Sequence, residues 1–222
     1  MPELPGLGGA RDPRVRVDMR DMPWSAVARL QIPGVSRCTA VLIEPTVAVT
    51  AAHCVYGRRL GRFVPPGSIH ALFGYDAGRY ARHAVVESYA VMPGFNPQGQ
   101  YGGGADLALI RFNKPVSDRV VPLAPDARAG MPIMLGGYGQ DRQEVVLADP
   151  ACTTRGISQG WDNRPMLVHD CQGTRGTSGG PVFTRLPDGT WALAGVQVAS
   201  NTYGVGGAAV PVATVRAMLA AQ

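Results

Sequence analysis

The sequence lacks any apolar run of the roughly 20 residues that a membrane-spanning helix needs, which argues against a helical membrane span. Long stretches with helical periodicity are also scarce, whereas glycine (29) and proline (19) are abundant. That composition favours many short strands joined by turns. At 222 residues the chain can bury a full core, as one domain or as two small joined halves. We therefore expect an all-β protein.

The sequence also has little acidic charge, with 16 Asp and Glu against 21 Lys and Arg and a formal net charge of +5. Basic patches are typical of nucleic-acid binding. The basic residues, mainly arginines, are nevertheless scattered, apart from a cluster at Arg58, Arg59 and Arg62. No basic stretch interleaved with aromatics accompanies them, and no recognition-helix pattern does. We interpret the charge as a solvated basic surface and expect no nucleic-acid or membrane partner.

The four cysteines include no closely spaced pair of the kind that binds zinc. They form two plausible disulfide pairs, Cys38 with Cys54 and Cys152 with Cys171, although four cysteines allow three pairings. Two disulfides imply an oxidising compartment. The N-terminus has no basic start followed by an apolar core, so it does not itself read as a secretory signal. We expect a leader removed before Met1, and a secreted or periplasmic protein.

Strand-like segments divide the chain into two series. We expect a loose arm over residues 1–20, a first barrel over 21–113, a connector over 114–128, a second barrel over 129–211 and a terminal helix over 212–221. The predicted architecture is two antiparallel six-stranded β-barrels with a cleft between them, in a single domain over 1–222. The expected strands are 26–30, 39–43, 47–50, 69–73, 83–91 and 107–112 in the first series, and 131–136, 144–147, 166–169, 181–184, 191–199 and 208–211 in the second.

Three short motifs carry chemistry. Residues 50–54 read TAAHC, residues 105–112 read ADLALIRF, and residues 176–183 read GTSGGPVF. A serine hydroxyl is a poor nucleophile until a base takes its proton, and a histidine oriented by an acid is such a base. His53, Asp106 and Ser178 therefore predict a nucleophilic serine hydrolase. The order His, Asp, Ser argues against an esterase of the α/β-hydrolase type, in which serine comes first.

These three blocks, in this order and spacing, resemble those of the chymotrypsin-like serine peptidases. Residues 12–15 and 22–27, with the ending at 206–219, are similar to the bacterial glutamyl-endopeptidase-like branch. The resemblance implies an endopeptidase that works through an acyl-enzyme, with His53 as base, Asp106 orienting it and Ser178 as nucleophile. It also implies an oxyanion hole formed by the N–H groups of Gly176 and Ser178. No cofactor or metal is implied.

The chain departs from this family at two places. Thr177 stands where many members have an aspartate that pairs with a new N-terminus after activation, so we expect the arm to support the site instead. Glu-specific relatives have a histidine in the substrate pocket, and Gln197 replaces it here. We therefore expect a neutral, partly polar pocket that is not strictly Glu-specific, with His169 in a structural role. The expected pocket residues are Gln172, Gly173, Arg175, Gln197, Val198, Ala199 and Ser200.

The function predicted from the sequence is a secreted, monomeric serine endopeptidase acting on polypeptides. The alternative is a catalytically silent binding protein with a peptidase fold, or an unactivated precursor. Reaction of Ser178 with a serine-directed probe distinguishes these interpretations.

Overall fold

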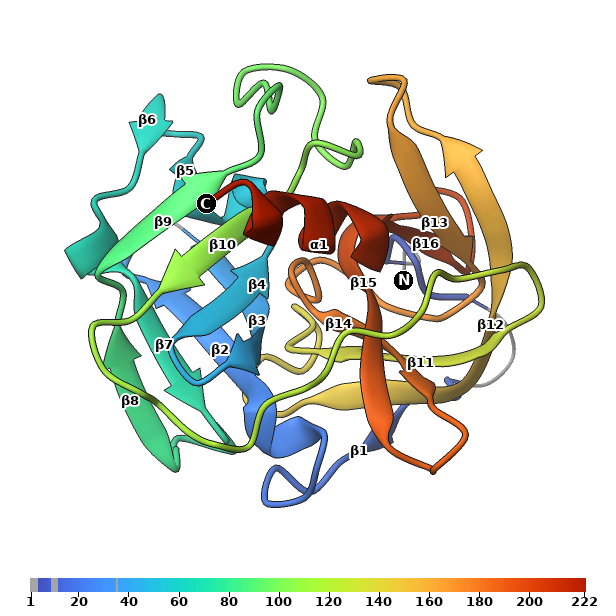
Figure 1. The fold of residues 1–222 in the computed structure, drawn as a ribbon, viewed down its shortest axis with the longest axis horizontal. Coiled ribbons are helices and arrows are strands. Elements are labelled where there is room, and N and C mark those ends of the chain that lie inside the picture. The colour runs from blue at the N-terminus through green and yellow to red at the C-terminus, as the bar shows by residue number, and fades with distance from the viewer. Residues whose placement is uncertain (1–3, 9–11, 35) are drawn as a thin grey trace.

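A computed structural model describes residues 4–8, 12–34 and 36–222 of the protein. Two large antiparallel sheets lie side by side, the first on the left of Figure 1 and the second on the right. The single α-helix of the described residues, α1 (Val212–Ala220), follows the last strand. Its arginine Arg216 donates to the Ala124 carbonyl, and Gln222 just beyond it accepts from Arg111 of the first sheet. The chain end thus joins the two halves.

The first sheet curls round until its two end strands are neighbours in the chain. Its order is β8-β7-β2-β3-β4-β10-β9. The end strands β8 and β9 are joined by Val86 and Glu87, where Val86 N–H donates to Ile69 on one side and Glu87 N–H to Arg111 on the other. The strand expected over 83–91 is therefore two strands with a corner between them. The bounds are β2 (Val27–Ile32), β3 (Ser36–Glu44), β4 (Val47–Thr50), β7 (His70–Phe73), β8 (Arg82–Val85), β9 (Ser88–Val91) and β10 (Ala108–Arg111).

The second sheet closes into a six-stranded barrel through strand pairing, because β12 pairs with both β11 and β13. A short seventh strand from the arm, β1 (Val15–Arg16), is added to the edge of β12. The barrel strands are β11 (Pro132–Gly137), β12 (Leu147–Gln159), β13 (Pro165–His169), β14 (Pro181–Arg185), β15 (Trp191–Ser200) and β16 (Gly207–Pro211).

Strand β12 is the largest difference from the sequence-based expectation, which placed a strand only at 144–147. Asp149, Pro150 and Gly156 argue against a strand in the sequence, since proline cannot donate to a ladder. The structure accommodates Pro150 in a bulge, because the register with β11 shifts between Cys152 and Asp149. Bulges are among the sites where a strand tolerates proline.

Smaller elements complete the first half. They are the 3₁₀ turns η1 (Trp24–Ala26), η2 (Ala52–Val55) and η3 (Pro66–Ser68), and the hairpin strands β5 (Tyr56–Gly57) and β6 (Arg62–Phe63). Apolar packing is continuous between the halves: the ring of Trp24 meets Phe183 of β14 edge-on, with centroids 5.5 Å apart. Both disulfides are formed, Cys38–Cys54 and Cys152–Cys171. The expected all-β architecture with one terminal helix is confirmed.

Candidate active site

His53 lies in the 3₁₀ turn η2, directly after strand β4. Its neighbour Cys54 is bonded to Cys38 of β3, which fixes this turn against the sheet. The side chain of His53 is 16% exposed and its ring is stacked on Tyr101, with centroids 5.2 Å apart and planes 10° apart. The imidazole therefore has one covered face but still reaches solvent.

Asp106 orients this histidine from the loop just before β10. The carboxylate is 1% exposed, and it accepts from His53 Nδ1 at 2.7 Å and from the His53 backbone N–H at 2.9 Å. The Gly102 N–H donates to the same carboxylate at 2.9 Å. An ionised carboxylate only accepts hydrogen bonds, so the proton sits on Nδ1. Nε2 is then left with a free lone pair, as a general base requires.

Ser178 is held in a glycine-rich turn that packs against the first sheet. Gly179 has φ +78°, and a Cβ there would lie 2.1 Å from both Thr39 O and Thr50 Oγ1. The Ser178 carbonyl accepts from the Thr39 N–H at 2.8 Å and lies 3.8 Å from the Cys54 sulfur. The turn thus approaches the element that carries His53. Within the described residues the Ser178 hydroxyl makes no hydrogen bond, so the contact with His53 Nε2 is not formed in this conformation. Such contacts are often long in unliganded sites and tighten with substrate.

The N–H groups of Gly176 and Ser178 donate to no acceptor in the part of the chain that the structure describes. Those on either side are engaged, since Thr177 N–H donates to Thr174 and Gly179 N–H to Gln197. Gly176 has φ +93°, where a Cβ would lie 2.3 Å from the Tyr138 carbonyl. Thr39 Oγ1 donates to the Gly176 carbonyl at 3.0 Å. Two free donors in a constrained turn next to the serine suit a developing oxyanion.

Comparison with known proteins identifies the family. The sequence model of the family described as Trypsin matches residues 14–219. The chain belongs to the trypsin family. It is 29% identical to human Kallikrein-5 over 189 residues, which are 74% of this chain and 60% of that protein. It is 28% identical to human Transmembrane protease serine 5 over 204 residues, which are 78% of this chain and 42% of that protein. The chain thus spans about two fifths to three fifths of these curated relatives.

A solved structure of a Glu endopeptidase in complex with MPD shares the fold of this trypsin-family chain. The TM-score is 0.72 at 20% identity, and the match covers 96% of this chain and 97% of the other. None of the helices in the described residues is long and apolar enough to cross a membrane.

Two of the residues expected to form the substrate pocket of this trypsin-family chain, Gly173 and Ser200, are hydrogen-bonded to each other. The N-terminal segment 4–8 lies against them and against Gln172. Gln172 accepts from the Gly8 N–H at 3.3 Å and donates to its carbonyl at 2.9 Å. The Gly173 N–H donates to Gly6 O, and Ser200 Oγ donates to Gly173 O at 2.7 Å. A Cβ on Gly6 would lie 2.0 Å from the Gly173 carbonyl oxygen. Sequence reasoning missed this packing, because a short stretch rich in proline and glycine carries no strand pattern.

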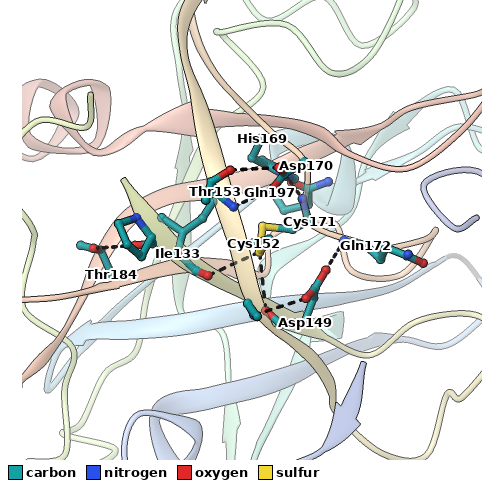
Figure 2. Close-up of a disulfide and its surroundings, with 12 residues drawn as sticks. Ile133, Asp149, Cys152, Thr153, His169, Asp170, Cys171, Gln172, Thr184 and Gln197 are labelled. Atoms are coloured by element: carbon teal, nitrogen blue, oxygen red, sulfur yellow. Dashed lines mark hydrogen bonds between the residues drawn. A yellow bond between two sulfur atoms is a disulfide. The ribbon is translucent and has the colours of Figure 1, made fainter. Parts of the chain in front are cut away.

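Gln197 is buried with His169 (Figure 2). The Cys171 N–H donates to His169 Nδ1 at 3.2 Å, so His169 Nε2 carries the proton and donates to Gln197 Oε1 at 2.7 Å. Gln197 Nε2 donates in turn to the Ala199 carbonyl. Burial lowers the pKa of His169. This pair is therefore neutral and satisfied. Of the other expected pocket residues, Val198 is buried, Ala199 is half-buried and Arg175 is exposed.

The Cys152–Cys171 disulfide fixes the segment before the Ser178 turn to β12 (Figure 2). Asp149 beside it accepts from the Gln172 N–H at 2.8 Å. Thr153 N–H donates to Asp170 at 2.6 Å. The base of the expected pocket is thus held by one covalent bond and two hydrogen bonds to carboxylates.

The position before Ser178 holds Thr177, which is buried. A different ion pair lies on the adjacent loop. The Arg14 side chain is 3% exposed and binds Asp141 at 2.6 Å and Asp12 at 2.8 Å. The Arg14 guanidinium holds the pKa of Asp12 below its usual range. Next to Asp141, the Gln140 N–H donates to the Arg175 carbonyl at 2.6 Å. The arm is thereby linked to the residue that precedes Gly176.

Among the residues that the structure describes, two groups of side chains have the residue types of a metal site. They are Cys38 with His53 and Cys54, and Cys152 with Asp170 and Cys171. In each group both cysteines form a disulfide. The thiolate is the form that binds metal, so neither group supplies one.

Proposed function

We propose that this trypsin-family chain is a secreted serine endopeptidase that uses His53, Asp106 and Ser178 as its catalytic triad. The observation that carries the proposal is the 2.7 Å bond from His53 Nδ1 to the buried Asp106 carboxylate, because it leaves Nε2 as a base beside the Ser178 turn. Two disulfides support an oxidising location.

Catalysis begins when the Ser178 side chain comes within hydrogen-bond distance of His53 Nε2. As Ser178 Oγ bonds to the substrate carbonyl carbon, Nε2 takes the hydroxyl proton. Asp106 stabilises the imidazolium that forms. The carbonyl oxygen becomes negative and accepts from the free N–H groups of Gly176 and Ser178, each worth about 3 kcal/mol in the transition state.

The intermediate collapses to an acyl-enzyme when the bond to the leaving nitrogen breaks and His53 gives that nitrogen its proton. Water then attacks the ester carbonyl, with His53 taking a proton from the water. Breakdown of the second intermediate releases the acid product and returns the proton to Ser178 Oγ.

We further propose that the residue on the acyl side of the cut is uncharged, and that cleavage is not strictly Glu-specific. The neutral Gln197–His169 pair and the satisfied amide of Gln172 offer a glutamate no cation. A site whose polar groups do not match a substrate charge discriminates in its favour only weakly.

Profiling against a peptide library tests the proposal. Wild type and Ser178→Ala are incubated with the library and the cuts are read by mass spectrometry. Cleavage in wild type alone, mainly after uncharged residues, is the expected result. Cuts concentrated after glutamate would overturn the specificity. A folded wild type that cleaves nothing would favour a binding protein or an unactivated precursor.

A further inference from the structure

A pocket of about 490 Å³ opens beside His53, apart from the residues expected to hold the acyl-side residue. Its walls include His53, Tyr101, Tyr56, Arg58, Arg59 and Leu60. The β5–β6 hairpin and the loop between β9 and β10 form two of its walls, and Gly34 between β2 and β3 also borders it. The hairpin and the loop both rise along the upper edge of the molecule in Figure 1.

An arginine and two rings form a stack in this pocket. The Arg58 guanidinium lies 5.0 Å from the centroid of the Tyr101 ring, which in turn is stacked on His53. The Tyr101 hydroxyl donates to the Pro97 carbonyl at 2.9 Å, which fixes the ring from its own loop. A cation held over an aromatic face keeps its N–H groups free for an anion. The pocket thus holds an oriented guanidinium within two ring spacings of the proposed base.

In the part of the chain that the structure describes, the arginines of the hairpin form no ion pair. Arg14, Arg16, Arg20, Arg29, Arg155 and Arg216 all form ion pairs with acids. Among the described residues no acid lies within ion-pair distance of Arg58, Arg59 or Arg62. Asp106, the acid behind His53, is already engaged by His53 and Gly102. Of these three, Arg58 and Arg59 line the pocket and present their charge to whatever enters it.

We propose that this pocket, with Arg58 and Arg59, is a subsite for an acidic side chain of the peptide substrate. The inference rests on the proposed function and deepens it. An extended peptide advances about 3.3 Å per residue and projects alternate side chains to opposite faces. The scissile bond lies at Ser178 and His53, and the pocket adjoins His53. The substrate residue that reaches the pocket is therefore either the one that precedes the acyl-side residue or the one that follows the cleaved bond. Arginine favours carboxylates through paired N–H donors. Exposed Leu60 (53%) and Phe63 (40%) offer apolar surface to the flanking substrate.

The test uses peptides with one fixed cleavage site, in which each neighbouring position carries Asp, Asn, Glu or Gln in turn. We expect an acidic residue at one position to raise kcat/KM about tenfold over its amide at low salt, and less at high salt. The Arg58→Gln/Arg59→Gln double variant loses this preference, and Arg58→Glu/Arg59→Glu turns it toward lysine. Arg62→Gln, on the same hairpin but outside the pocket walls, keeps it. Unfolding midpoints check that each variant is folded.

A second readout is independent of turnover. The same peptides compete with a fluorophosphonate for Ser178, so the concentration that halves the labelling rate reports binding. Acidic peptides should protect better in wild type and no better in the double variant. Equal protection by acid and amide peptides, with labelling intact, overturns the subsite alone. An acid preference that survives in the double variant does the same. Inhibition by heparin that depends on the arginines, without an acid preference, would assign them to polyanion binding instead. A wild type that neither labels nor cleaves contradicts the proposed function itself.

Discussion

His53 and His169 belong to different halves of the molecule, and their surroundings differ in every respect that matters for proton transfer. His53 is hydrogen-bonded to a carboxylate, reaches solvent and borders an arginine-lined pocket. His169 is hydrogen-bonded to the amide of Gln197, is 2% exposed and is neutral. The difference teaches that the partner and the exposure decide what a histidine does. The charges near His53 include unpaired arginines at a pocket, whereas His169 and Gln197 form a neutral pair.

Removing the negative charge of Asp106, the partner of His53, should have the largest effect on activity. In Asp106→Asn the amide can present its N–H₂ to His53 and stabilise the wrong tautomer, so we expect kcat to fall about 10⁴-fold. Steady-state kinetics on a cleaved peptide measure this loss. Asp162→Asn is the matched control, because Asp162 accepts from Gly104 and Ala105 of the same loop and has no contact with His53. A loss below tenfold in Asp106→Asn, or an equal loss in the control, would contradict the role of Asp106.

Removing the ion pair between Arg14 of the arm and Asp141 tests whether the arm stabilises the second half. Arg14→Ala leaves the Asp141 carboxylate without its cation, and we expect the free energy of unfolding to fall by about 2 kcal/mol. Because Gln140 beside Asp141 holds the Arg175 carbonyl, kcat should fall as well. Chemical denaturation and peptide kinetics measure the two effects. Arg16→Ala, whose pair with Asp76 is exposed, should cost less than about 1 kcal/mol and leave kcat unchanged. Equal effects in both variants would contradict the claim that the arm supports the active site.

Giving His169 a carboxylate partner, as His53 has, should have the smallest effect, and the effect is on stability. Burial lowers the pKa of His169 in the folded protein, so below its unfolded pKa of about 6.5 the unfolded state binds more protons. Wild-type stability should therefore fall as the pH drops below that value. In Gln197→Glu a carboxylate stabilises protonated His169, so this loss should shrink. Urea denaturation at pH 8 and pH 5.5 should show wild type losing about 1 kcal/mol more than the variant. Identical losses would mean that His169 does not titrate as described.

Much of this molecule could be predicted from its residues. The strands with a continuous apolar run, such as 39–43 and 107–112, lie where the sequence predicted them, because their side chains fill the core. Both disulfides, Cys38–Cys54 and Cys152–Cys171, join the cysteines that are closest to each other in the sequence. Ser178 stands between Gly176 and Gly179, and both glycines adopt the positive φ that other residues rarely reach.

The rest depended on contacts that local sequence does not encode. Pro150 concealed the middle of β12, and only the bulge against β11 makes a strand there acceptable. The corner at Val86 and Glu87 forms because their N–H groups donate to different segments of the chain, one to Ile69 and the other to Arg111. The packing of residues 4–8 on Gln172 and Gly173 depends on backbone groups far away in the chain.

The most direct test of the central claim is covalent labelling of the full chain by a fluorophosphonate, followed by intact-mass and peptide-mapping spectrometry. The account predicts one adduct per chain, located on Ser178, absent in Ser178→Ala and formed far more slowly in Asp106→Asn. A folded wild type that gains no adduct, or gains it at another residue, would contradict the assignment of Ser178 and His53 as nucleophile and base.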